Sequence, residues 1–552
     1  MARTSPMRIL KALTADHAAA ERLRVPVAEL RGMRAAAAEP GLGRRELLRR
    51  AAAAGIAASG LAGLSPAPAR AADEAGRPPR PARIAVVGGG IAGLTAALTL
   101  KDAGAAFTLY EANPSRLGGR IHTQRTHWAN GQTSEIGGEL IDVEHKKMLE
   151  LCRRFGLRTL DFAGAVPPHA EETLHFNGEY YPRAQADEDF KPVYHRLRAD
   201  LQAAGEVMWD DATPEGIALD RMSIREWIET RVPGGMSSPL GRFIDVAYVV
   251  EYGAETELQS SLALILLMGY QPNPGHFNVW GLSDERYRVE GGNDRLTQAM
   301  AAALPAGSVR MGHRLVAVRA NADGTQTLTF DEGGTTRAVT ADHTILTVPL
   351  PILQGLDLSR AGFDPRMTNL LRDARMGYCT KLNMQFTART WLGEGPWPGV
   401  ASGDCFTDLP FQQVWETTRG QAGATGVLIQ YAGGDAARRL RPATAFPTES
   451  DPYVRALADS MLTGVDRVFP GTKAKWNGRA QLSAWHENPY ALGAYSYWPV
   501  AYLHRYAGYE GTRQGNVHIG GEHTSYDYQG FMNGGATEGQ RAAEEVLADL
   551  RA

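Results

Sequence analysis

One stretch constrains the fold more than any other part of the 552-residue chain. The apolar, β-branched run RIAVV at 83–87 leads directly into Gly-Gly-Gly-Ile-Ala-Gly at 88–93, and an Ala/Leu-rich pattern continues to Asp102. A short apolar run of this kind is typical of a buried parallel strand. Gly104 ends the helical pattern, and a second apolar run follows at Phe107–Tyr110. The order of strand, turn, helix and strand predicts a βαβ unit, and hence an α/β fold with a parallel sheet.

The glycines of this turn have separate physical tasks. Gly88 permits the tight turn, Gly90 lets the backbone approach a pyrophosphate, and Gly93 lets helix and strand pack closely. The N-terminus of the helix then offers N–H groups to phosphates. Glu111 ends the second strand, where a carboxylate accepts hydrogen bonds from both ribose hydroxyls and disfavours a 2′-phosphate. The pattern predicts a dinucleotide site with contacts from Gly88, Gly90, Ile91, Ala92, Gly93, Glu111 and Ala112.

A second glycine-containing segment reads Arg-Leu-Gly-Gly-Arg-Ile-His-Thr at 116–123. It resembles the second FAD signature of the flavin amine oxidase family, in which a Gly-Gly-Arg segment lies along the pyrophosphate. The resemblance implies that Gly118 and Gly119 contact FAD and that Arg120 supplies cationic donors. Two further glycine contacts are expected at Gly137 and Gly138.

The far end of the chain carries the matching part of such a site. Residues 517–543 contain a strand pattern at Val517–Ile519, a Gly-Gly turn and a helical pattern from Gly534 onward. In the same family this end closes the cofactor site. The resemblance places Glu522 on the ribityl chain and the backbone N–H of Met532 near the pyrimidine edge of the flavin. It also implies cofactor contacts at Gly521, at Phe531, at Leu315 within the strand pattern 313–318, and at Trp485.

The resemblance covers residues 83–548 and implies a two-domain fold. A discontinuous Rossmann-like FAD-binding domain would be interwoven with a substrate domain of mixed sheet and helices, an α/β (α+β two-domain) architecture. Helical spacing of apolar residues makes 145–280 mostly helical. The predicted boundaries are 83–145, 281–350 and 476–552 for the FAD-binding parts, and 146–280 and 351–475 for the substrate parts.

Few acid–base residues are expected, because the flavin carries the redox chemistry and the protein supplies orientation and electrostatics. Lys381 lies in the apolar strand pattern at 376–386 and resembles the family lysine that holds a water against flavin N5. The alternative is a lysine at a strand end with its ammonium in solvent. Tyr495 and Phe531 match the two aromatic positions that flank the substrate amine, although core packing would also explain them.

The cofactor is expected to be bound without a covalent link. In the monoamine oxidases the position of Ala494 is a cysteine bonded to the flavin, and alanine cannot form that bond. The chain has three cysteines, Cys152, Cys379 and Cys405, without metal spacing or a CxxC motif. We therefore expect neither a metal site nor a disulfide framework.

The residues around Leu140 bear on the substrate. L-Amino-acid oxidases of this superfamily hold the substrate carboxylate with an arginine that Leu140 replaces here, and Glu139 adds a negative charge. Both residues favour an amine without an α-carboxylate, although Arg286 or Arg288 could substitute from elsewhere. Four residues are expected where the substrate sheet lines the pocket, with Glu416 either pairing with a distal cationic group or lying on the surface: Gln412, Gln413, Trp415 and Glu416.

The resemblance implies oxidative deamination of a small-molecule amine. A hydride passes from the amine-bearing carbon to flavin N5, the imine is hydrolysed, and O2 reoxidises the flavin to give H2O2. The alternatives are an L-amino-acid oxidase, an amine dehydrogenase that passes electrons to a redox protein, and a flavin redox or accessory protein without an amine substrate. A desaturase or porphyrinogen-type oxidase is disfavoured by the set of Lys381, Tyr495 and Phe531. Both a monomer and a homodimer stay open.

The N-terminal region resembles a twin-arginine export signal. Arg44–Arg45 precede a mildly apolar stretch that ends in Ala-Arg-Ala at 69–71, which predicts a signal at 1–71, a linker at 72–82 and a periplasmic or secreted protein. The stretch is too short for a spanning helix, so no stable membrane insertion is expected after signal removal; an attached Ala-rich helix is the alternative. Residues 1–71 hold 12 Lys or Arg against 5 Asp or Glu in a chain of formal net charge -3, so the remainder is acidic, which disfavours nucleic-acid binding.

Overall fold

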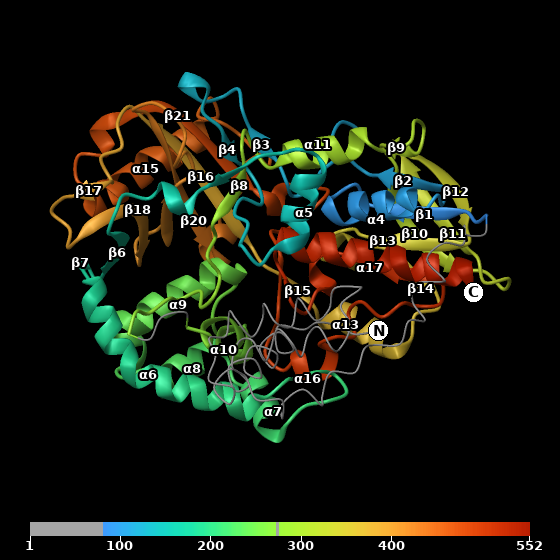
Figure 1. The fold of residues 1–552 in the computed structure, drawn as a ribbon, viewed down its shortest axis with the longest axis horizontal. Coiled ribbons are helices and arrows are strands. Elements are labelled where there is room, and N and C mark those ends of the chain that lie inside the picture. The colour runs from blue at the N-terminus through green and yellow to red at the C-terminus, as the bar shows by residue number, and fades with distance from the viewer. Residues whose placement is uncertain (1–80, 272–274) are drawn as a thin grey trace, which may run out of the picture. The chain divides into compact units, whose positions relative to one another are not determined.

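The computed structural model describes residues 81–271 and 275–552 (Figure 1). The predicted export signal and nearly all of the predicted linker lie outside these residues. Within the described part of the chain, no helix combines the length and the apolar character that a membrane crossing requires.

A five-stranded parallel sheet is assembled from segments that are far apart in sequence. Its order is β23-β13-β1-β2-β9, and every neighbouring pair is parallel. Helix α4 (Ile91–Asp102) follows β1 and packs against the C-terminal helix α17 (Met532–Arg551), as the blue and red helices of Figure 1 show. The predicted βαβ unit and α/β fold class are therefore confirmed. The strands are β1 (Ile84–Val87), β2 (Phe107–Glu111), β9 (Val309–Met311), β13 (His343–Leu346) and β23 (Val517–Ile519).

Glycine sets how closely these elements approach one another. A Cβ atom on Gly93 would lie 1.8 Å from the carbonyl oxygen of Gly88, and one on Gly539 would lie 2.0 Å from that of Ala92. Both distances are far below van der Waals contact, so α4 packs against the turn after β1 and against α17 only because these two positions lack side chains.

A four-stranded sheet with the order β12-β11-β10-β14 extends the dinucleotide part. Strand β14 pairs in parallel with β10, although it falls within the predicted substrate segment 351–475. That boundary therefore differs from the structure, because pairing between distant segments decides to which sheet a strand belongs. The strands are β10 (Arg314–Ala320), β11 (Gln326–Glu332), β12 (Thr335–Ala341) and β14 (Asp357–Arg360).

An eight-stranded mixed sheet forms the second structural part. Its order is β21-β16-β20-β19-β18-β6-β7, with β17 paired to β18. Helix α15 (Pro452–Val468) shares an apolar core with this sheet. Strand β21 pairs with β16, although the predicted boundaries assign it to the FAD-binding part 476–552. The strands are β6 (Ala170–Phe176), β7 (Glu179–Tyr180), β16 (Cys379–Phe386), β17 (Gly393–Glu394), β18 (Val400–Thr407), β19 (Gln413–Glu416), β20 (Gly426–Gly433) and β21 (Trp476–Ala484).

Most of the described residues between 145 and 280 are helical, as the apolar spacing predicts. Side-chain caps start several helices of this region, and Ser223 forms a full capping box with Glu226. The predicted boundary at 145 assigns helix α5 to the substrate part. Its buried residues Met148 and Leu151 instead join the core of the dinucleotide part. The helices are α5 (Lys146–Arg154), α6 (Arg183–Ala204), α7 (Pro214–Asp220), α8 (Ile224–Arg231), α9 (Pro239–Tyr252) and α10 (Ser261–Met268).

Short elements connect these parts. Strand β3 pairs with β4, β5 pairs with β8, and β15 pairs with β22, each in the antiparallel sense. The remaining strands and α-helices are β3 (Thr123–Gln124), β4 (Ser134–Glu135), β5 (Thr159–Asp161), β8 (Tyr287–Val289), α11 (Asp294–Ala302), α12 (Leu350–Gln354), α13 (Pro365–Asp373), β15 (Arg375–Met376), α14 (Gly434–Arg438), β22 (Ser496–Tyr497) and α16 (Leu503–Tyr506).

Candidate active site

A cavity of about 510 Å³ takes its walls from both structural parts. One end lies at the carboxyl ends of β1, β2, β13 and β23, where open α/β sheets bind their ligands. The other end is bordered by residues of β16, β18, β19 and β20. Three of the residues predicted to line the site, Gly93, Gln412 and Glu416, do not line this cavity, and Gly93 packs against Gly88 instead.

The glycine-lined end of the cavity is built for a dinucleotide. Glu111 is buried at the end of β2, where Oε2 accepts a hydrogen bond from the N–H of Gly89 at 2.6 Å and Oε1 accepts one from Asn113 at 2.7 Å. Burial raises the pKa of Glu111. A Cβ atom on Gly90 would meet only the Cα of Gly119, at 3.8 Å, so the turn leaves open space before the first N–H groups of α4. These donors, together with an acidic strand end, fit the phosphates and a ribose of FAD.

An ion pair joins the two ends of the chain at this cavity. Arg120 donates to Glu522 Oε1 at 2.9 Å and to the carbonyl oxygen of Ala494 at 2.6 Å. Glu522 Oε2 also accepts from Ser496 Oγ at 2.7 Å. Although burial opposes ionisation, the charge of Arg120 and these hydrogen bonds hold the pKa of Glu522 below its usual range. Arg120 therefore fixes an anionic Glu522, in addition to the predicted role toward phosphate.

Lys381 lies on the inner strand β16 and is only 8% exposed. Its Nζ donates to the carbonyl oxygen of Gly137 at 2.9 Å and to Glu139 Oε2 at 2.8 Å. The same atom lies 5.3 Å from the ring centroid of Trp415. The alternative of a strand-end lysine with its ammonium in solvent is therefore wrong.

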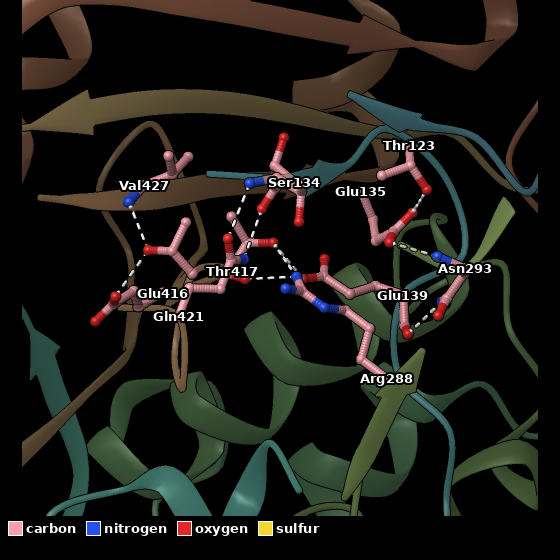
Figure 2. Close-up of polar contacts among 12 residues, drawn as sticks. Thr123, Ser134, Glu135, Glu139, Arg288, Asn293, Glu416, Thr417, Gln421 and Val427 are labelled. Atoms are coloured by element: carbon pink, nitrogen blue, oxygen red, sulfur yellow. Dashed lines mark hydrogen bonds and ion pairs between the residues drawn. The ribbon is translucent and has the colours of Figure 1, made fainter. Parts of the chain in front are cut away.

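Glu139 is buried between two cations. Besides Lys381, Glu139 Oε1 accepts from Thr417 Oγ1 at 2.5 Å and lies 3.5 Å from Arg288 Nη1. Asn293 donates to the backbone oxygen of Glu139 at 2.7 Å (Figure 2). Burial opposes ionisation, but Lys381 and Arg288 hold the pKa of Glu139 below its usual range. Glu139 therefore does not offer the substrate an uncompensated negative charge, contrary to the prediction.

Neither of the two arginines named as possible substitutes for the carboxylate clamp lines the cavity. Arg288 is 1% exposed and donates to the backbone and hydroxyl of Thr417. Arg286 is exposed and pairs with Asp161 at 2.8 Å. The cavity wall instead carries Arg419, which sequence reasoning missed, and this guanidinium is bonded to Asp404 at 2.7 Å.

Two aromatic residues predicted to flank the substrate line the cavity. The hydroxyl of Tyr495 donates to the carbonyl oxygen of Val250 at 2.9 Å and lies 2.8 Å from that of Tyr431. Burial raises the pKa of Tyr495 well above its usual value, which keeps the phenol neutral. Phe531 lies at the N-cap of α17, with its ring centroid 5.1 Å from that of His145.

Strand alternation sorts the four residues predicted on the substrate sheet. Gln413 and Trp415 line the cavity, and Glu416 points to the opposite face of β19. There Glu416 is 1% exposed and accepts hydrogen bonds from Arg389 and Trp391. The prediction that Glu416 pairs with a distal cation of the substrate is therefore wrong, as is its surface alternative. Gln412 does not line the cavity, because its side chain accepts from the N–H of Gly433.

Further carboxylates on the cavity wall were not found from sequence. Glu172 pairs with Arg183, as Asp404 does with Arg419. Glu251 and Glu285 differ, because no described cation lowers the pKa of either. Burial raises the pKa of Glu251 to about 7 and that of Glu285 well above its usual value. These residues belong to no motif, and only the folded chain brings them to one wall, together with Asp284.

One group of described residues has the donor chemistry of a metal site. His343, His518 and Asp549 place ligand atoms within 4.8 Å of one another. Asp549 is bonded to Arg513, and His518 Nδ1 lies 3.0 Å from Glu545. None of the three lines the cavity, and His343 starts β13 at the amino end of the sheet. The group therefore takes no part in this site.

Comparisons with known proteins agree with this chemistry. A profile of the family described as "Flavin containing amine oxidoreductase" matches residues 91–547. An L-amino-acid oxidase from Mus musculus is 24% identical over 495 residues, which span 85% of this chain and 71% of that protein.

Two solved structures share the fold. A putrescine oxidase bound to putrescine has a TM-score of 0.69 at 21% identity and covers 85% of this chain and 99% of its own. The cyclohexylamine oxidase from Brevibacterium oxydans has a TM-score of 0.71 at 21% identity and covers 86% of this chain and 100% of its own. At this identity the likeness shows the fold alone.

Proposed function

Since the chain belongs to the flavin-containing amine oxidoreductases and is a flavin-dependent enzyme that acts on amines, we propose that its substrate is a cationic amine without an α-carboxylate. The observation that carries the proposal is a pair of carboxyl groups on the cavity wall, those of Glu251 and Glu285, that have no cation partner among the described residues. Each described cation at this end, in contrast, is already bonded to a carboxylate. Burial favours the protonated form of both carboxyls. A bound ammonium would favour their ionised form and pair with it, whereas a substrate carboxylate would meet, at this end, no described cation that lacks a carboxylate partner.

The residues on the cavity wall have separate roles in the proposed reaction. FAD, when bound, supplies the two-electron acceptor for the amine and the route of these electrons to O2. Gly137 and Glu139 accept hydrogen bonds from two of the three N–H groups of Lys381, and the third N–H binds a water molecule. Tyr495 and Phe531 orient the amine through their ring faces. The balanced change converts amine, water and O2 into a carbonyl compound, ammonia and H2O2. Because Ala494 offers no thiol, FAD is proposed to bind non-covalently.

Amino-acid oxidation is the second candidate. It is favoured by Arg419 on the cavity wall and by the curated relatives that are L-amino-acid oxidases. For this reaction Arg419 would have to exchange Asp404 for a substrate carboxylate, which leaves Asp404 without its cation.

Anaerobic mixing of the holoenzyme with a panel of substrates tests both candidates. The panel contains aliphatic diamines, monoamines such as cyclohexylamine, and L-amino acids. Bleaching of the flavin absorbance by amines but not by amino acids is expected, followed by H2O2 and ammonia when air is admitted. Bleaching by amino acids alone would favour the second candidate, and slow reoxidation in air would point to a redox protein as acceptor. Bleaching by no member of the panel would refute both.

Export is a further part of the proposal. The paired arginines Arg44 and Arg45 and the small-residue site at 69–71 support passage through the twin-arginine pathway to the periplasm or beyond. Replacing both arginines by lysine should retain the protein inside the cell, and secretion unaffected by that change would contradict the assignment.

A further inference from the structure

We propose that Glu139 is a positioning residue that acts through Lys381, holding its ammonium charged and oriented toward the cavity so that a single N–H is left for water. The inference rests on the proposed function for the role of Lys381. Glu139 touches neither the substrate nor the reacting atoms in this role.

The geometry of Lys381 leaves its ammonium little freedom. An ammonium has three N–H donors, and Gly137 and Glu139 accept two of them at 2.9 and 2.8 Å. The ring of Trp415 lies 5.3 Å from Nζ. One donor is therefore left for the cavity, with its direction set by the other two.

Glu139 is itself held on every side. Its Oε1 accepts from Thr417 at 2.5 Å, and its backbone oxygen accepts from Asn293. Asn293 also donates to the carbonyl oxygen of Gly138 at 3.0 Å. Figure 2 shows Glu139 and Arg288 turned toward each other with Thr417 beside them. A carboxylate fixed in this way can orient the lysine, whereas a mobile one could not.

Glu139 also compensates the charges of the two cations beside it. Arg288 and Lys381 are both buried, and among the described carboxylates Glu139 alone contacts each of them. Without it, two cations would face each other in a desolvated site, which disfavours the charged ammonium. Glu139 thus makes a buried, protonated Lys381 compatible with the arginine behind it.

The test is a double-mutant cycle on the holoenzyme. Glu139→Gln, Lys381→Met and the double variant are reduced photochemically, without any amine, and the return of the oxidised-flavin absorbance in air is followed. Glu139→Gln should slow this return by about ten- to a hundredfold, as expected for loss of a positioned proton donor. In the Lys381→Met background the same change should add less than about twofold. An equal additional loss in that background would overturn the proposal.

Matched variants separate positioning from general damage. Glu135→Gln alters a buried glutamate of the same network that contacts Thr123 and Asn293 but not Lys381, and it should leave the reoxidation rate within about twofold. Glu139→Asp retains the charge and should recover part of the rate. An equal loss in Glu135→Gln, or no recovery in Glu139→Asp, would assign Glu139 a structural role alone.

The thermal unfolding temperature provides a readout independent of catalysis. Glu139→Gln leaves two buried cations without their shared carboxylate, whereas the double variant leaves Arg288 alone, so the double variant should unfold at a higher temperature than Glu139→Gln. Additive losses would contradict the coupling. Because reoxidation is measured without an amine, failure of the substrate panel and failure of this inference remain distinguishable.

Discussion

The uncompensated carboxylates at the cavity wall lead to a prediction about substrate preference at the scale of single residues. Glu251→Gln and Glu285→Gln should each raise the KM for a diamine about tenfold or more, because the distal ammonium would favour the ionised carboxylate, and a charge-assisted hydrogen bond contributes roughly 1.5–3 kcal/mol. The KM for a monoamine with an uncharged tail should change much less. Steady-state kinetics with matched substrates measures the difference, and equal changes for both substrates would argue against a contact with the distal ammonium.

Glu135 makes stability depend on pH. Burial raises its pKa from 4.5 to about 7, and Arg288 and Asn293 only partly oppose this. The folded protein then binds the proton more tightly than the unfolded chain, so this contribution to stability is present below pH 4.5 and is lost as the pH rises through about 7. The loss amounts to at most about 3 kcal/mol.

Glu135→Gln isolates this contribution, because Glu251 and Asp527 also have a pKa of about 7. The unfolding temperature of the variant, relative to that of the unmodified protein, should increase between pH 4.5 and 7. A difference that stays constant across this range would mean that Glu135 does not titrate there.

Sequence motifs locate residues whose task depends on neighbours along the chain. The turn at 88–93 is of this kind, and its outline could be predicted. Glu139 could not be interpreted in the same way, because its partners Lys381 and Arg288 lie 242 and 149 residues away. The same holds for Glu416, whose burial follows from the alternation of β19 and from Arg389, 27 residues earlier.

At the scale of elements, local patterns predict a strand or helix but not the sheet that receives it. Strand β1 and helix α4 were expected close to where they lie, because their periodicity is strong and glycine marks their ends. Strands β14 and β21 fall in the wrong predicted part, since pairing with β10 and β16 decides their place. Long-range pairing of this kind leaves no local signal.

The contact between α4 and α17 predicts the effect of one added methyl group. Gly539→Ala would place a Cβ atom 2.0 Å from the carbonyl oxygen of Ala92, so the helices must separate, at a cost of about 1–3 kcal/mol. We expect a lower unfolding temperature and weaker FAD retention, because α4 directly follows the turn that is expected to bind the phosphates. Gly355→Ala is the control, since its Cβ would meet no atom closer than 3.4 Å. Equal effects of both changes would show that the helix contact is not the cause.

At the scale of the whole molecule, the cavity joins the two ends of the described chain. The turn at 88–93 and the segment at 521–532 contribute to one wall, and the Arg120–Glu522 ion pair links residues 402 positions apart. This ion pair is a single contact between the two segments, whereas bound FAD would contact both of them along its length. The cofactor is therefore expected to contribute to the stability of the folded chain as well as to its chemistry.

Removal of FAD tests that expectation. Acid denaturation should release all of the flavin into solution, because Ala494 provides no thiol for a covalent link. The apoprotein should unfold at a lower temperature than the holoenzyme and recover when FAD is added, since a ligand at a hundred times its Kd stabilises the folded state by about 2.7 kcal/mol. Scanning calorimetry measures the shift, and FMN serves as the control because it lacks the adenosine that the Glu111 end should bind. Recovery with FMN as complete as with FAD would mean that the dinucleotide end contributes nothing, and flavin retained by the denatured chain would contradict non-covalent binding.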